Sequence, residues 1–205
     1  MANQIKYAFR MTHIDNIPHI VRCGLVHASS PLHDEHYVSI GDNQVINRRN
    51  ESPVNGYHLN DYIPFYFGPR SPMLYVIQHG YNGVRRVEPE NIVYCVVGID
   101  DLISNNVNCI FTDGHALNKF TVFYAKEQLS SINEIVKYDD VYSTQWNPEN
   151  DLDLKRRKEA ELLIEEDLPP QYVKGYAVYN EIAKQRLVDM GVVLEKISIK
   201  PNYYF

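Results

Sequence analysis

The chain has 205 residues, of which 44 % are hydrophobic and 22 % charged, and a formal net charge of −6. This composition is that of a globular protein and excludes a disordered chain dominated by one sign of charge. The negative net charge also argues against a protein that holds nucleic acid through overall positive charge. We predict a single domain over residues 1–205, long enough to bury a core without a disulfide or a metal.

No segment contains the roughly 18 apolar residues that a membrane-spanning helix needs, and the first residues show no apolar run behind a basic start. We therefore expect a soluble, cytoplasmic protein that makes no membrane contact. The three cysteines, Cys23, Cys95 and Cys109, are an odd number without a CxxC pair. We expect them to be buried thiols, and we expect neither a disulfide framework nor a metal site.

The first third of the chain predicts a strand, a polar turn and a short helix. Residues 6–11 alternate in polarity, which indicates a strand. Residues 17–21 carry apolar side chains at helical spacing after a polar segment that can cap a helix, and Gly24 is placed to end it. Residues 29–56 are polar and aperiodic, so we expect a loop or a short helix there.

Residues 59–74 combine four aromatic residues with three prolines, an arginine and a serine. Proline fixes its own φ and pushes the preceding residue toward extended backbone, so this spacing predicts a nearly rigid, non-helical path. A rigid aromatic path with polar interruptions suits the wall of a pocket for a flat ligand. The sixteen tyrosines of the chain likewise favour a ring-lined cleft or a large recognition surface.

The rest of the chain predicts strands and helices without a regular βαβ alternation. We expect strands over 92–97, 108–111, 173–179 and 192–199, helices over 118–129 and 180–190, and a mobile loop over 143–153. Residues 155–166 are strong helix formers, and their propensity alone predicts one helix. Since the strands and helices do not alternate regularly, the predicted fold class is α+β. Neither GxGxxG nor a P-loop motif is present, so a bound nucleotide would lack either familiar phosphate-binding loop.

Several side chains are candidates for chemistry. Glu161 heads an apolar run, where a carboxylate loses water and becomes a better proton acceptor; the alternative is a surface glutamate on a helix. Arg49 and Arg70 lie nearest to the aromatic stretch, as pyrophosphate ligands or as surface residues. His13 and His115 follow predicted strands, as cleft residues or as solvated ones. No Ser-His-Asp order, HExxH helix or paired-cysteine spacing supports a hydrolase or metalloenzyme.

Basic residues gather at 48–49, 85–86 and 155–158. They form either solvated faces or a cleft that focuses positive potential in an acidic protein.

Taken in order, five motifs of this chain resemble the DarT family of DNA-targeting ADP-ribosyltransferase toxins. They are Thr12-His13-Ile14-Asp15-Asn16, Arg48-Arg49-Asn50, the aromatic block from Asp61 to Leu74, Phe111-Thr112-Asp113-Gly114-His115 and Ala160-Glu161. The aromatic block is highly specific, and the likeness extends to the aromatic end Tyr203-Tyr204-Phe205.

The resemblance implies an ADP-ribosyltransferase fold, a split and strongly bent β-sandwich core with peripheral helices and NAD bound in its cleft. In such a fold the glutamate heads a strand, so residues 160–164 become a strand and the helix is confined to about 153–159. Glu161 is then the catalytic carboxylate and Arg49 the arginine at the reacting ribose and pyrophosphate. The implied NAD-binding residues are Arg10, Thr12, His13, Asn16, Arg49, Tyr66, Arg70 and His115. Some family members carry histidine where Arg10 stands.

The implied reaction transfers ADP-ribose from NAD to a base, thymine or guanine, in single-stranded DNA and releases nicotinamide. NAD is the co-substrate, and no metal is needed if a carboxylate, an arginine-held pyrophosphate and a closed aromatic wall stabilise the positive charge on the ribose. We hypothesise that Glu161 orients the ribose and accepts the proton that the attacking base loses. The DNA strand then crosses residues 142–158. The expected DNA contacts are Tyr142, Trp146, Lys155, Arg156 and Arg157, by stacking and by phosphate binding.

Two other classes of function remain open. An ADP-ribosyltransferase that acts on RNA or protein would share the NAD pocket but use another acceptor surface. A non-enzymatic nucleic-acid-binding module would bind DNA without consuming NAD. The family resemblance also implies an antitoxin partner that removes ADP-ribose from DNA.

Overall fold

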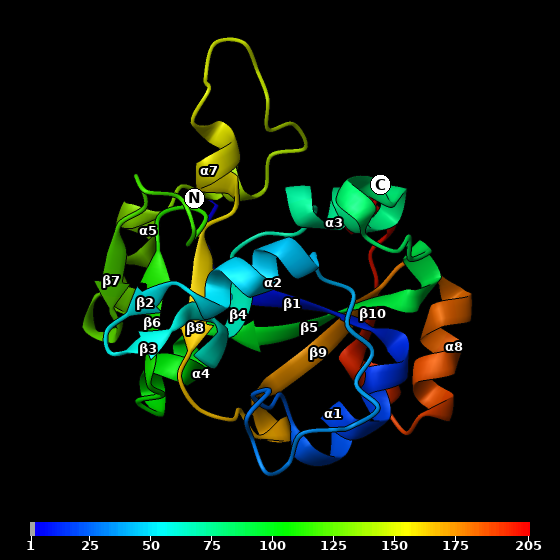
Figure 1. Ribbon diagram of the computed structural model, residues 1–205. Coiled ribbons are helices and arrows are strands. Elements are labelled where there is room, and N and C mark those ends of the chain that lie inside the picture. Colours follow the sequence, from blue (N-terminus) through cyan, green and yellow to red (C-terminus); the bar gives the residue numbers. More distant parts are fainter. Residues whose placement is uncertain (1–2) are drawn as a thin grey trace.

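Eight strands form one mixed sheet in the computed structural model, which describes residues 3–205 (Figure 1). The strand order is β10-β9-β5-β1-β4-β8-β6-β7. These strands are β1 (Tyr7–His13), β4 (Ile63–Tyr66), β5 (Ile92–Gly98), β6 (Cys109–Thr112), β7 (Phe123–Ala125), β8 (Glu161–Ile164), β9 (Val173–Val178) and β10 (Ile197–Ile199). A separate hairpin pairs β2 (Pro53–Val54) with β3 (Tyr57–His58).

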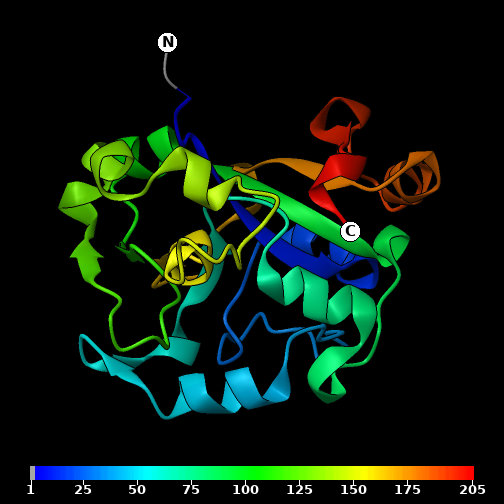
Figure 2. The same cartoon turned by 90° about the horizontal axis from the view of Figure 1, so that it is seen from above.

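Helices surround this sheet, and the α+β class is confirmed. They are α1 (Ile17–Cys23), α2 (Asn43–Asn50), α3 (Pro72–His79), α4 (Ile99–Ser104), α5 (Ile132–Ile135), α6 (Tyr138–Val141), α7 (Leu154–Lys158) and α8 (Glu181–Asp189). Seen from above, α2, α3 and α7 border the same region of the molecule (Figure 2). Within residues 3–205, no helix is both long and apolar enough to cross a membrane.

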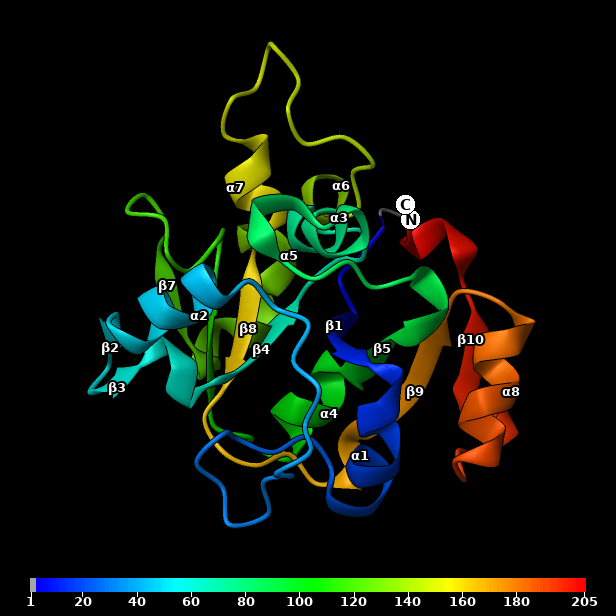
Figure 3. The same cartoon turned by 45° about the vertical axis from the view of Figure 1, so that its right-hand side comes forward.

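The sheet is divided between β1 and β4. These two strands share one registered pair, Phe9 with Tyr66, whereas every residue of β1 is paired with a residue of β5. With so few ladder bonds between them the two halves can diverge, and Figure 3 shows β4 and β8 on one side and β5, β9 and β10 on the other. The structure therefore has the split, bent sheet that the sequence led us to expect.

Both faces of β5 are buried. Successive side chains of a strand point to opposite faces, and those of β5 enter two different cores. Val93, Cys95 and Val97 belong to the main core, which also holds apolar residues of α1 and α8. Ile92 and Tyr94 belong to a second core beneath α3 and the carboxyl terminus. This double burial explains the continuous apolar run that predicted a central strand.

Several predicted elements are confirmed. β1 and α1 follow each other as expected, and Gly24 ends α1 with φ +83°, a conformation that favours glycine. The Asn180 side chain caps α8 by accepting a hydrogen bond from the backbone N–H of Ala183 at 3.0 Å. Cys95 and Cys109 are buried free thiols, and Cys23 is a partly buried one.

Two predictions from apolar spacing were wrong. Residues 118–129 form no α-helix: β7 pairs with β6, and a 3₁₀ segment follows over Lys126–Ser131. The supposed apolar stripe is not a core face, since Phe120 is 70 % exposed. Of the predicted strand 192–199, only β10 pairs with β9, because a 3₁₀ turn occupies Leu194–Lys196.

The aromatic stretch contains a 3₁₀ turn at Leu59–Asp61, then a strand and then a helix, so the predicted non-helical path holds only between Tyr62 and Ser71. β4 uses the first half, and α3 then begins at Pro72, where the missing N–H of proline costs nothing. The Ser71 side chain caps this helix by accepting from the backbone N–H of Leu74 at 3.2 Å. The third proline of the aromatic stretch, Pro72, therefore starts a helix.

Glu161 heads β8, and helix α7 ends at Lys158, as the family resemblance implied. Helix propensity failed here because β8 lies between β4 and β6 and pairs with both. Residues 143–153, before α7, contain no regular helix or strand and project from the rest of the chain (Figures 1 and 3).

Candidate active site

A cavity of about 350 Å³ lies against β1, β4 and β8 and is covered by α2 and by loop residues between positions 26 and 42. We call it the main cavity. Four residues predicted to contact NAD or catalyse the reaction line it: Arg10, Arg49, Tyr66 and Glu161. They come from three strands and a helix, so the fold gathers residues that are far apart in the chain.

Arg49 and Glu161 form a buried ion pair in this wall. Nη1 of Arg49 donates to Oε2 of Glu161 at 2.7 Å, and the two residues are 7 % and 1 % exposed. Oε1 of Glu161 accepts from the backbone N–H of Ala116 at 2.9 Å. Each oxygen of this carboxylate thus has a donor, which is the condition for keeping a buried charge.

Strand pairing decides which way Glu161 points. It stands opposite Tyr66 in the antiparallel pairing of β8 with β4, and Leu162 stands opposite Phe65. Because side chains alternate, Leu162 enters the main core while Glu161 faces the cavity on the same side as Tyr66. Burial raises the pKa of Tyr66 well above its ordinary value, and the neighbouring Glu161 carboxylate adds to the rise.

His115 lies near this ion pair but lines a different cavity. Its Nδ1 accepts from the backbone N–H of Leu117 at 3.1 Å, and its own backbone N–H donates to the carbonyl of Arg156 at 2.9 Å. Burial lowers the pKa of His115, although the nearby Glu161 carboxylate opposes that shift. At neutral pH this imidazole is therefore predominantly uncharged.

The other predicted NAD contacts from the first third of the chain occupy two adjoining cavities. Thr12, Asn16 and Arg10 line a small one of about 110 Å³, in which Asn16 Nδ2 donates to Thr12 Oγ1 at 2.8 Å. Arg10 borders both this cavity and the main one. His13 lines a third cavity, which shares residues 39–42 with the main cavity.

Arg70 is not among the lining residues of these cavities. Its backbone has φ +54°, and its backbone N–H donates to the hydroxyl of Tyr94 at 3.1 Å. Its guanidinium lies 4.4 Å from the ring centroid of Phe205, a cation–π contact. The structure thus holds Arg70 against the carboxyl terminus, apart from the pair of Arg49 and Glu161.

A second large cavity, of about 650 Å³, lies between α2, α3, α7 and the turn that follows β6. We call it the α7 cavity. Its polar lining includes Arg48, His115, Lys155, Arg156 and Glu159. It shares Asp42, Val45 and Met73 with the main cavity, so the two cavities are neighbours.

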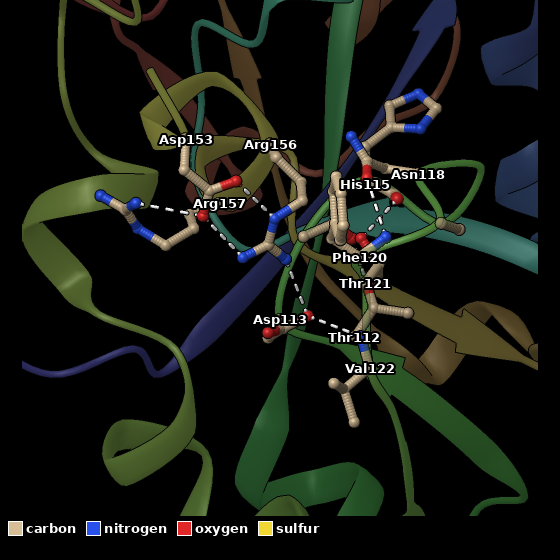
Figure 4. Close-up of polar contacts among 12 residues, drawn as sticks. Thr112, Asp113, His115, Asn118, Phe120, Thr121, Val122, Asp153, Arg156 and Arg157 are labelled. Atoms are coloured by element: carbon tan, nitrogen blue, oxygen red, sulfur yellow. Dashed lines mark hydrogen bonds and ion pairs between the residues drawn. The ribbon is translucent and has the colours of Figure 1, made fainter. Parts of the chain in front are cut away.

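Arg156 and Arg157, both predicted to contact DNA, are engaged with carboxylates (Figure 4). Arg156 lies between Asp113 and Asp153, with N···O distances of 3.0 and 2.8 Å. Arg157 pairs with Asp140 at 2.7 Å and also with Asp151 and Asp153. These arginines hold the segment before α7 in place.

By contrast, Lys155 is exposed, and within residues 3–205 no carboxylate pairs with it.

The two aromatic residues predicted to stack on DNA bases are both partly buried. The ring of Tyr142 is stacked on Tyr138 with centroids 4.1 Å apart, and burial raises its pKa above the ordinary value. Trp146 makes edge contacts with Tyr75 and Phe205 at centroid distances of 5.5 and 5.4 Å. Trp146 therefore ties the projecting loop to α3 and to the end of the chain.

Sequence reasoning missed three groups at this site. The backbone N–H of Ala116 holds Glu161, but a backbone donor leaves no trace in a sequence. Lys158 is 1 % exposed, and its Nζ donates to the carbonyls of Pro69 and Val141 at 3.3 and 3.1 Å; burial lowers its pKa to about 8. Glu159 lines the α7 cavity and is 7 % exposed. In the sequence, the signal for Glu159 was its position two residues before Glu161.

Within residues 3–205, no three His, Cys, Asp or Glu side chains are grouped so that they could hold a metal ion.

Comparisons with known proteins identify the family of this chain. The family model described as "ssDNA thymidine ADP-ribosyltransferase, DarT" matches residues 9–205. A DNA ADP-ribosyl transferase of Escherichia coli O127:H6 is 33 % identical over 183 residues, which cover 87 % of this chain and 83 % of that protein. A fusion of a DNA ADP-ribosyl transferase with a DNA ADP-ribosyl glycohydrolase, from Thermosipho africanus, is 26 % identical over 89 % of this chain and 45 % of the fusion.

Among solved structures, Thermus sp. 2.9 DarT in complex with ADP-ribosylated ssDNA superposes with a TM-score of 0.82 and 25 % identity, over 100 % of this chain and 99 % of that one. The fold implied by the resemblance is thereby confirmed. Since the family model covers nearly all of the chain, this protein belongs to the DarT family of single-stranded DNA thymidine ADP-ribosyltransferases.

Proposed function

We propose that this protein transfers ADP-ribose from NAD to thymine in single-stranded DNA and releases nicotinamide, with Glu161 as the catalytic carboxylate. The observation that carries the proposal is the buried pair of Arg49 and Glu161 in the wall of a cavity at the split of the sheet. The family model supports the same reaction. We also propose that residues 1–205 act as one domain and that the protein works in the cytoplasm, where DNA and NAD are available.

The lining of the main cavity fits NAD. Its volume of about 350 Å³ is within the usual range for sites of small molecules and cofactors. Arg10 and Arg49 supply cations from two sides of the cavity, and a guanidinium matches the charge and shape of a pyrophosphate. Tyr66 supplies a ring, and Thr12 and Asn16 supply polar groups in the adjoining small cavity.

Glu161 and Arg49 have complementary roles in this proposal. Breaking the bond to nicotinamide leaves positive charge on the ribose, and a carboxylate already held in place stabilises that charge without having to reorganise. Arg49 holds Glu161 in position and offers its remaining N–H groups to the pyrophosphate. Tyr66, opposite Glu161 in the sheet, helps to exclude water from the site.

We propose that the DNA strand approaches over the α7 cavity and the segment 142–158. Lys155 is the side chain best placed to contact a phosphate, because it is exposed and no carboxylate within residues 3–205 pairs with it. Arg156, Arg157 and Tyr142 shape this surface, and Trp146 offers a ring to a base. Single strands suit this site, because the reacting nitrogen of a paired base is hidden.

We further propose that an ADP-ribosyl glycohydrolase acts as the antitoxin partner. The relative from Thermosipho africanus carries both activities in one protein. A product that remains attached to DNA calls for an enzyme that removes it.

The test uses single-stranded oligonucleotides of known sequence, incubated with NAD and digested for mass analysis. We expect an ADP-ribose adduct on thymidine, release of an equal amount of nicotinamide, and neither product with Glu161→Gln. Adducts on RNA or on protein, with DNA unmodified, would instead support the other transferase class. DNA binding without nicotinamide release would identify a binding module.

A further inference from the structure

Glu159 presents its carboxyl group to the α7 cavity from an otherwise buried residue. The residue is 7 % exposed, yet within residues 3–205 its carboxylate forms no hydrogen bond or ion pair, and it lines the α7 cavity. Because no group within residues 3–205 bonds to it, this carboxylate is available to a molecule that enters the cavity. The cavity that it faces is large enough to admit part of a nucleotide, at about 650 Å³.

The charged groups around Glu159 come from several elements. Lys155, Lys158 and Glu161 act on it electrostatically. Arg48, Asp42, His115, Asp153 and Arg156 also line its cavity. Burial is the strongest influence and raises the pKa of Glu159 to about 8, with the two lysines opposing the rise and Glu161 adding to it. This carboxylate is therefore a much better proton acceptor than an ordinary glutamate.

Glu161 stands in a different environment although it is only two residues away. Its two oxygens already accept from Arg49 and from the backbone of Ala116. Both carboxylate oxygens of Glu161 are therefore engaged with donors of the protein, whereas the carboxylate of Glu159 faces the α7 cavity, where it can meet a substrate. Two carboxylates with opposite environments commonly divide the work between electrostatic stabilisation and proton transfer.

We infer that Glu159, rather than Glu161, accepts the proton that the target base loses, as a second catalytic residue on the acceptor side of the site. This inference rests on the proposed function. The geometry that supports it is the position of Glu159 in the α7 cavity, beside the main cavity that contains Glu161. It replaces our hypothesis from the sequence, in which Glu161 carried out both tasks.

The step balances as follows. Glu159 takes the proton from the ring N–H of thymine, and the electron pair left on that nitrogen forms the bond to C1′ of the ribose. The bond between C1′ and the nicotinamide nitrogen breaks, and its electron pair leaves with neutral nicotinamide. Glu159 then releases the proton to solvent. The net products are the ADP-ribosylated base, nicotinamide and one proton.

The other polar groups of the cavity fit this task less well. Nδ1 of His115 accepts a hydrogen bond from the backbone N–H of Leu117, so in the neutral imidazole Nε2 carries the hydrogen and cannot accept a proton. Arg48, Lys155 and Arg156 carry positive charge and have no lone pair to offer. Asp153 is bound to Arg156 and Arg157.

The central experiment compares Glu159→Gln with the wild type in single-turnover ADP-ribosylation of a single-stranded oligonucleotide. We expect the rate to fall by about 100-fold or more, while the dissociation constants for NAD and for the oligonucleotide stay within about twofold. Glu159→Asp, which keeps a carboxylate, should retain more activity than Glu159→Gln. Glu195→Gln, an exposed glutamate remote from the cavities, is the matched control. Circular dichroism establishes that each variant is folded.

The pH profile separates proton transfer from a structural role. The wild-type rate should increase with pH and level off near the raised pKa of Glu159, and Glu159→Gln should lack this increase. The pKa of Lys158 also lies near 8, but an increase caused by Lys158 would persist in Glu159→Gln. If Glu159→Gln modifies DNA at the wild-type rate, or keeps the wild-type pH profile, the inference is wrong while the proposed function stands. If the wild type leaves DNA unmodified, both are wrong.

Discussion

Arg49 and Glu161 are 112 residues apart in the chain, and their side chains meet at 2.7 Å inside the protein. One comes from α2 and the other from the first position of β8. The pair is almost inaccessible to water, so each charge is stabilised by the opposite charge of its partner. It links the stability of the protein to its proposed chemistry.

Removing one member of this pair should destabilise the fold strongly. Arg49→Ala leaves the Glu161 carboxylate buried with the Ala116 N–H as its donor, which should lower the free energy of unfolding by about 3–5 kcal/mol. The double variant Arg49→Met with Glu161→Met should recover most of that stability and remain inactive. Urea unfolding measures both effects. A loss below about 1 kcal/mol in Arg49→Ala would show that the pair contributes little.

Glu159 should make stability depend on pH in a defined direction. Its pKa is raised from 4.5 to about 8 in the folded state, so between these values the folded protein keeps a proton that the unfolded chain has lost. Its contribution to stability is therefore complete below pH 4.5 and disappears as pH rises toward 8. The slope is at most about 1.4 kcal/mol per pH unit.

Thermal unfolding at several pH values, with Glu159→Gln for comparison, measures this contribution. The variant should lose the decline between pH 4.5 and 8. Lys158 has the opposite sign at higher pH: its pKa is lowered from 10.5 to about 8, so it increases stability as pH rises from 8 to 10.5. An unchanged pH dependence in Glu159→Gln would contradict the burial of this carboxyl group.

Gly68 should not tolerate a side chain. A Cβ at this position would overlap the backbone carbonyl of Val141, which also accepts from Lys158. Overpacking of this kind costs about 1–3 kcal/mol, so Gly68→Ala should lower the unfolding midpoint. Gly41→Ala is the control, because its Cβ would meet the Ile46 side chain at an ordinary 3.4 Å. Equal stability of the two variants would contradict the close approach.

Substitutions of Lys155 and Arg157 should have different effects, the first on DNA binding and the second on stability. Lys155→Ala should weaken binding of single-stranded DNA and reduce the slope of log affinity against log salt by about 1, with little change in stability. Arg157→Ala breaks contacts with three aspartates and should lower stability by about 1–3 kcal/mol. Lys200→Ala, at an exposed lysine, is the control. An unaltered salt slope in Lys155→Ala would remove this lysine from the interface.

Trp146 is the single tryptophan of the chain, so it reports directly on its loop. Its edge contacts with Tyr75 and Phe205 should change when a base stacks nearby, and its fluorescence should be quenched as oligonucleotide is added. Trp146→Phe should weaken binding modestly, by about tenfold. Constant fluorescence at a saturating oligonucleotide concentration would place the DNA elsewhere.

Much of the fold was predictable from short-range patterns. The alternating and continuous apolar runs predicted β1 and β5, and the caps at Asn180 and Gly24 predicted the ends of helices. These signals are local: side-chain period, capping groups and backbone freedom act over a few residues. The order of the five family motifs predicted the fold and identified Glu161 and Arg49 as candidates.

Local patterns failed where pairing partners decide the outcome. Residues 161–164 favour a helix by propensity, but hydrogen bonds to β4 and β6 on both sides make them a strand. Residues 123–125 joined the sheet for the same reason, through β6. The sequence by itself determined the residue types of the site and much of its framework. Tertiary structure alone decided that Arg49 neutralises Glu161 and that Arg156 and Arg157 are engaged with aspartates. It also decided that the Glu159 carboxylate lines the α7 cavity with no hydrogen-bond partner among residues 3–205. The reason is that burial and hydrogen bonding depend on segments that are distant in the chain.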